Sequence, residues 1–131
     1  MRYHNWPIYF EAFVASRRHM PFEWGVNDCA LFAVDCVLAL TGIDYALPML
    51  RQHTNAKEAY RSVRQSGGLA AIATAALGEP LPVRCAQVGD VVLTKAGKRD
   101  MLAICNGRLA LAPGANGLES VPLGSLCWRV G

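Results

Sequence analysis

The stretch FEWGVNDCALFAVDCVLALTG, residues 22–42, decides how this chain is expected to fold. Asn27 or Asp28 is suited to begin a helix, because a short polar side chain can accept a hydrogen bond from an unpaired backbone N–H there. Residues 29–40 are apolar except for Asp35, and Gly42 is a typical helix stop. A helix that is apolar on nearly every side is buried. The stretch therefore predicts a central helix over about 29–41, in which Asp35 must find a polar partner.

Helices are also expected on both sides of this stretch. Trp6, Phe10 and Phe13 recur at helical spacing, and this helix should end near Arg17, before Pro21. Further along the chain two more helices are expected, separated by Ser66-Gly67-Gly68. The first opens at Thr54 or Asn55, where Asn55 and Glu58 have capping-box spacing, and the second covers Leu69 to Leu77 and is closed by Gly78.

The second half of the chain has the pattern of β-strands and tight turns. An Asn-Gly pair between two apolar runs is a strong hairpin signal. The expected strands and turns are a strand over Val88–Thr94, a strand over Met101–Cys105, a turn at Asn106-Gly107, a strand over Arg108–Ala112, a turn at Asn116-Gly117, and strands over Leu118–Val121 and Cys127–Val130. Helices followed by an antiparallel meander predict an α+β fold, a single domain over residues 1–131 with the N-terminal helices covering one face of a C-terminal sheet.

Composition and charge narrow the range of functions expected for this chain. The net charge of +3 is spread along the chain, with basic residues adjacent only at Arg17-Arg18 and Lys98-Arg99, so nucleic-acid binding is not expected. No apolar run is long enough to span a membrane, and the first residues lack a signal-peptide core, which predicts a protein made in the cytoplasm. Five cysteines with no CxxC pair indicate neither a disulfide framework nor a metal site, and no cofactor is expected.

Cys29 is the one residue whose position suggests chemistry. It lies in the first turn of a buried helix, where unpaired amides and the helix dipole favour the thiolate and lower the thiol pKa. The alternative is that Cys29 is an inert packed cysteine, as most buried cysteines are. Asp28 is most simply the N-cap, and its charge opposes the thiolate. Trp24 either lines a groove or packs against the helix start.

These residues resemble a known family. Trp24-Gly25 and Asp28-Cys29, opening an apolar helix, are similar to the nucleophile region of NlpC-type cysteine peptidases, compact papain-like enzymes that cut peptidoglycan stem peptides. Val88-Gly89-Asp90-Val91-Val92-Leu93 looks like the Gly-Asp strand of that family. The resemblance implies a papain-like fold from about residue 20 to the end. The closing Trp128-Arg129-Val130 and the compact length are similar to domains from tailed phages and prophages, where such domains sit in or near the tail tip.

The chain departs from the family at the catalytic base. Met101 stands where the resemblance implies the catalytic histidine, and the segment expected to hold the third polar residue, Leu109–Ala112, is entirely apolar. Of the three histidines, His4 and His53 are expected to be exposed. His19 precedes Cys29 on the same connector and is the candidate for a relocated base.

Three functions follow from this pattern. The favoured one is a structural or assembly component of a phage or prophage tail tip, with a degenerate NlpC-like fold, other tail proteins as partners and a place in the virion tail. The second is an active cysteine hydrolase of peptidoglycan stem peptides, using Cys29 with His19 as base. The third is a non-catalytic module that binds a peptide or partner segment at Trp24 and Asp28.

Overall fold

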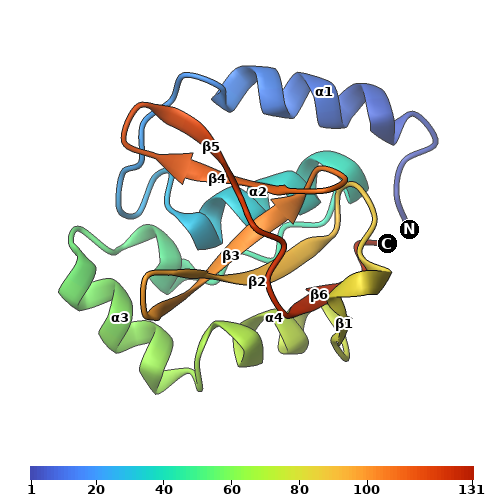
Figure 1. The fold of residues 1–131 in the computed structure, drawn as a ribbon. Coiled ribbons are helices and arrows are strands. Elements are labelled where there is room, and N and C mark those ends of the chain that lie inside the picture. Colours follow the sequence, from blue (N-terminus) through green and yellow to red (C-terminus); the bar gives the residue numbers. More distant parts are fainter.

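The computed structural model describes all residues, 1–131, as four α-helices and a six-stranded antiparallel sheet (Figure 1). The helices are α1 (Trp6–Arg17), α2 (Cys29–Thr41), α3 (Ala56–Gln65) and α4 (Leu69–Leu77), with short 3-10 helices η1 (Pro48–Arg51) and η2 (Val83–Cys85). The strands are β1 (Leu81–Pro82), β2 (Val91–Ala96), β3 (Arg99–Cys105), β4 (Ala110–Gly114), β5 (Gly117–Val121) and β6 (Leu126–Trp128). The sheet order is β1-β6-β2-β3-β4-β5. The expected α+β fold, helices first and sheet second, is confirmed.

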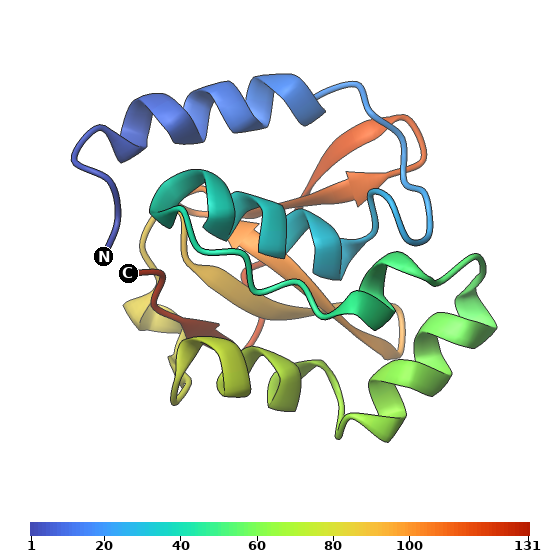
Figure 2. The same ribbon diagram turned by 180° about the vertical axis from the view of Figure 1, so that it is seen from behind.

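Helix α2 is the centre of the molecule, as its sequence predicts. The Asp28 carboxylate accepts a hydrogen bond from the Leu31 N–H at 3.0 Å, and Gly42 ends the helix with φ of 80°. Leu31, Phe32 and Cys36 on this helix are fully buried. Figure 2 shows α2 in front of the sheet, with α1 on one side of it and α4 on the other. Truncating a core side chain such as Phe32 to Ala should cost about 3–5 kcal/mol of stability.

The two faces of the sheet are covered differently. The main core lies between the helices and the sheet face that carries Val91, Leu93, Leu102 and Ile104. A smaller apolar cluster lies on the opposite face, where β-strand side chains meet the segments around η2 and residues 121–123. Helix α4 is fastened to the sheet by the Trp128 indole N–H, which donates to the Thr74 hydroxyl at 3.1 Å.

A buried aspartate holds both ends of the chain. Asp90 is 1% exposed, and its carboxylate pairs with the Arg2 guanidinium at 2.8 Å. The same carboxylate accepts the backbone N–H groups of Val130 and Gln87, each at 3.0 Å. Only glycine suits position 89 beside this Asp90–Arg2 contact, because its φ is +91° and a Cβ there would lie 2.9 Å from the Arg2 guanidinium. The Gly-Asp pair of the sequence is therefore a structural clamp as well as the start of a strand.

The strand boundaries differ from those predicted at several points. β2 begins at Val91 because residues 87–90 form a turn, in which the Asp90 N–H donates to the Gln87 carbonyl. The turn after β3 is one residue later than expected: the Asn106 N–H donates to the Leu109 carbonyl, so the two residues between that pair form the turn. β1 has only two residues, too few to leave a sequence pattern.

Candidate functional site

Cys29, the first residue of α2, lines a pocket of about 450 Å³. The pocket lies between the start of α2, helix α3 and the hairpin that joins β2 to β3. Trp24, Asp28, His53 and Met101 line it together with Cys29. The structure thus brings together three of the four site residues named from sequence, and it adds His53.

Burial dominates the acidity of the Cys29 thiol. It raises the pKa of Cys29 from its ordinary value to about 11. The Leu102 backbone, which hydrogen-bonds the sulfur, lowers this pKa, while the neighbouring Asp28 carboxylate raises it. The expected lowering by the helix start is therefore outweighed, because the thiolate gains less from nearby amides than it loses in leaving water. At neutral pH the thiol therefore stays protonated.

No histidine lies on the strands beside the thiol. Leu102 contacts the sulfur through its backbone, and the preceding residue, Met101, lines the pocket while packing against the apolar cluster on the opposite face of the sheet. Strand β4 continues the sheet with the sequence ALAPG, which carries no side chain able to orient a base. The thioether of Met101 cannot take a proton from the thiol, and the carboxylate that β3 brings to the pocket, Asp100, is paired with Lys95 at 2.6 Å, so neither strand supplies a histidine base.

His19 does not reach the pocket. It is exposed on the connector between α1 and α2, where its backbone lies against Gly117 at the start of β5. A general base must come within hydrogen-bond distance of its proton donor. The structure therefore gives no support to His19 as the base for Cys29.

His53 is buried, and the expectation that it is exposed was wrong. Only 6% of it is exposed, and its Nε2 atom has no hydrogen-bond partner. The loop that carries His53 directly follows η1, and it is held close to the interior because Leu50 of η1 packs in the core. Gly25 makes room for it: at φ of +74° a Cβ on Gly25 would lie 2.3 Å from the His53 carbonyl oxygen. Because this contact joins distant segments, no local pattern around His53 could reveal it.

Trp24 and Asp28 have structural roles at the pocket wall. The Trp24 ring meets Phe22 edge to face at a centroid distance of 4.6 Å and Tyr60 at 5.7 Å, so it both packs and lines the pocket. The Asp28 carboxylate accepts hydrogen bonds from the backbone N–H groups of Leu31 and Gly25, both at 3.0 Å. The predicted N-cap role of Asp28 is confirmed.

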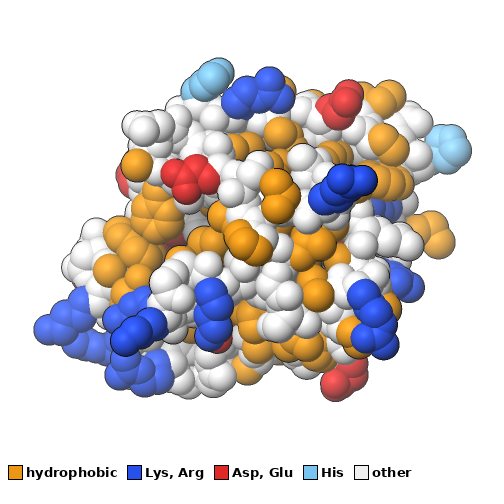
Figure 3. All heavy atoms as spheres, in the orientation of Figure 1, with side chains coloured by type: hydrophobic (Ala, Val, Ile, Leu, Met, Phe, Trp, Pro, Cys, Tyr) orange, Lys and Arg blue, Asp and Glu red, His pale blue; other side chains and the backbone are white.

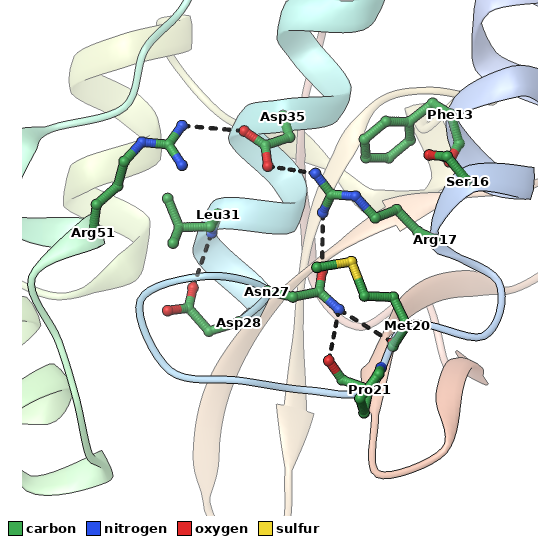
Figure 4. Close-up of polar contacts among 10 residues, drawn as sticks. All are labelled: Phe13, Ser16, Arg17, Met20, Pro21, Asn27, Asp28, Leu31, Asp35 and Arg51. Carbon is green, nitrogen blue, oxygen red and sulfur yellow. Dashed lines mark hydrogen bonds and ion pairs between the residues drawn. The ribbon is translucent and has the colours of Figure 1, made fainter.

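A polar network fixes the connector that leads into Cys29 (Figure 4). Arg17 donates to Asp35 at 2.6 Å and to the side-chain oxygen of Asn27 at 2.9 Å. Arg51 completes the group by donating to Asp35 at 3.3 Å. Asn27 in turn donates to two backbone carbonyls of the connector. The partner that Asp35 requires is thus Arg17, and the network sets the direction in which the chain enters α2.

All five cysteines are free, and no group of three His, Cys, Asp or Glu side chains is placed to hold a metal ion. None of the helices combines the length and the apolar character that a membrane crossing requires.

Comparison with known proteins gives one match. A family described as a domain of unknown function, DUF6950, matches residues 1–130. No curated protein and no solved structure shows significant similarity to the chain. Because the family model covers nearly the whole sequence, this chain belongs to the DUF6950 family.

Proposed function

We propose that the chain is a non-catalytic structural or assembly component of a tailed-phage or prophage tail tip, with a degenerate papain-like fold of the NlpC type. The resemblance at Trp24-Gly25 and Asp28-Cys29 motivates the family and the tail assignment. The placement of a cysteine at the start of a buried helix, against a sheet, is compatible with that fold. Other tail proteins would be the partners, and the protein would be made in the cytoplasm and incorporated into the virion tail.

The observation that carries the non-catalytic part is the absence of a histidine on β3 beside Cys29. The sulfur is next to β3, whose residues at the pocket are Arg99, Asp100 and Met101, and none of them is a histidine. Losing general-base catalysis typically costs about 10²–10⁴-fold in rate. Burial of the thiol adds to this loss, because it keeps the sulfur in its less nucleophilic, protonated form.

The test is a substitution in the encoding phage or prophage. Cys29→Ala should leave tail assembly and particle yield unchanged, since the proposal gives the sulfur no chemical role. Phe32→Ala serves as the positive control, because loss of a fully buried core side chain should remove the protein from particles. A tail defect caused by Cys29→Ala in a protein that still folds would contradict the proposal.

A second candidate, a cysteine hydrolase acting on peptidoglycan stem peptides, is favoured by His53. His53 lines the same pocket as Cys29, and its Nε2 has no hydrogen-bond partner. No side chain contacts that Nε2, however, so no third group orients the ring through it.

The hydrolase hypothesis makes a separate prediction. If it is correct, purified protein releases products from stem-peptide fragments, and both Cys29→Ser and His53→Gln abolish the release. The non-catalytic proposal predicts that the wild type and both variants give the same background rate.

A further inference from the structure

Four basic side chains gather beside the Cys29 pocket. Lys57, Arg61 and Arg64 follow one another at helical spacing along α3, and Arg99 joins them from the start of β3. These four, with Tyr60, line one shallow depression. Figure 3 shows the corresponding concentration of Lys and Arg side chains at the lower left, over α3. We call these four residues the basic cluster.

The basic cluster has no acidic partner in the protein. The four ion pairs of the structure join Arg2, Arg17, Arg51 and Lys95 to aspartates elsewhere. The Glu58 carboxylate on α3 is engaged by Thr54 and the N-cap residue Asn55. Like charges at i and i+4 on a helix repel each other, which destabilises the helix. The cluster is therefore a region of positive charge that an external anion would relieve.

The basic cluster and the Cys29 pocket are continuous. Tyr60, Arg64 and Arg99 line both depressions. The Arg99 guanidinium lies 3.8 Å from the centroid of the Tyr60 ring, which holds this cation at the boundary between them. On the pocket side the wall includes Trp24, Ala59 and Val63. One ligand can therefore contact an apolar, aromatic pocket and a positive rim at the same time.

His53 gives an independent indication of a ligand in the pocket. It is 94% buried, as its 6% exposure implies, and its Nε2 has no hydrogen-bond partner. A buried polar atom without a partner destabilises the protein, and that cost is removed when a ligand supplies the missing hydrogen bond. The pocket therefore contains one unsatisfied polar group in an otherwise mainly apolar wall.

We propose that this surface docks an acidic peptide segment of a partner protein, whose apolar or aromatic side chain enters the Cys29 pocket while its carboxylates face the basic cluster. This deepens the proposed non-catalytic function by giving the chemistry of the partner. Arginine suits the role because its planar guanidinium pairs with carboxylates through two parallel hydrogen bonds.

A peptide fits this surface better than a nucleic acid does. A nucleic acid needs a continuous positive track for its phosphates. Here the pocket wall carries the carboxylates of Asp28 and Asp100 beside Lys98 and Arg99, so the positive charge does not run through the pocket as an unbroken track. Those carboxylates would repel a phosphate backbone running through the pocket. An acidic peptide avoids them, because its charges can be confined to the segment over the cluster.

The experiment measures binding of short fluorescent peptides by polarisation. The probes are acidic peptides rich in Glu and Asp, with a single Trp or Leu at each position in turn. Neutral versions carry Gln and Asn in place of the acids, and a single-stranded oligo-dT tests the nucleic-acid alternative. At least one acidic probe should bind the wild type, more weakly as salt is raised.

Variants then locate the site. The double variant R61E/R64E and the single variant Trp24→Ala should each weaken binding about tenfold or more. The matched control is R18E/R108E, which makes the same change in net charge at two exposed arginines outside both depressions. That control should retain the affinity within about twofold. Circular dichroism confirms that each variant is folded.

Three results would overturn the inference. These are no binding by any acidic probe, equal loss in both charge-reversal variants, and tighter binding of the oligo-dT than of every peptide. None of these results bears on catalysis. The Cys29→Ala test of the proposed function therefore stands or fails separately.

Discussion

The Asp90 clamp offers a stability prediction with a worked magnitude. Replacing Asp90 with Ala removes the acceptor for the Arg2 guanidinium and for the backbone N–H groups of Val130 and Gln87. Removing one member of a buried ion pair typically costs about 3–5 kcal/mol, because the partner remains partly buried without compensation. An unfolding entropy of about 2.1 cal/mol/K per residue gives about 0.28 kcal/mol/K for this chain. The melting temperature should therefore fall by about 11–18 °C.

The assay is thermal and urea unfolding followed by circular dichroism. Asp100→Ala is the matched control, because it breaks an ion pair of 2.6 Å between exposed partners, Lys95 and Asp100. An exposed pair contributes at most about 1 kcal/mol, or about 4 °C here. If Asp90→Ala lost no more stability than Asp100→Ala, the reasoning that the clamp holds both chain ends would be refuted.

Three further predictions concern the neighbourhood of the site. Gly25→Ala should lower the free energy of unfolding by more than about 1 kcal/mol in urea, because the residue has a positive φ and the added Cβ would also collide with a backbone carbonyl. Gly97→Ala is the control: its φ is also positive, but the space around it is open, so its unfolding free energy should fall by less. Arg17→Ala should cost about 1–3 kcal/mol in the same assay, because Asp35 would keep only a half-exposed partner; a change below about 0.5 kcal/mol would contradict the network. The contribution of Cys29 to stability should be fully present below about pH 8.5 and be lost as the pH rises towards 11. The total loss should be about 3 kcal/mol, because the thiol ionises in the unfolded chain over this range while it stays protonated in the folded protein. Urea unfolding across this pH range should show a shallower decline for Cys29→Ala, and an identical slope would count against the raised pKa.

Local signals in the sequence predicted the helices well. Asp28 and Gly42 set the ends of α2 through a side-chain cap and a left-handed stop, both of which act within a few residues. Asn55 caps α3 in the same way, by accepting the Glu58 N–H at 2.9 Å. These features need no tertiary context, so periodicity and caps alone are enough to predict them.

The site was only partly predictable, because its missing parts depend on distant contacts. His53 is buried through its contact with Gly25, far away in the sequence, and the net acidity of Cys29 depends on how closely the strands cover it. The spacing of Lys57, Arg61 and Arg64 is visible in the sequence, but the approach of Arg99 requires the fold. The sequence prediction therefore did not include the basic cluster, because it considered only basic residues that are adjacent in the chain.

The central claim is that Cys29 is not an activated nucleophile, and its alkylation rate tests this most directly. The measurement is the rate of iodoacetamide modification against pH, with Cys29→Ala used to subtract the other four cysteines. Burial of the thiol predicts slow modification at neutral pH and a rise only above about pH 10, following the pKa of about 11. Rapid modification with an apparent pKa at or below about 7 would show an activated thiolate and would contradict the account.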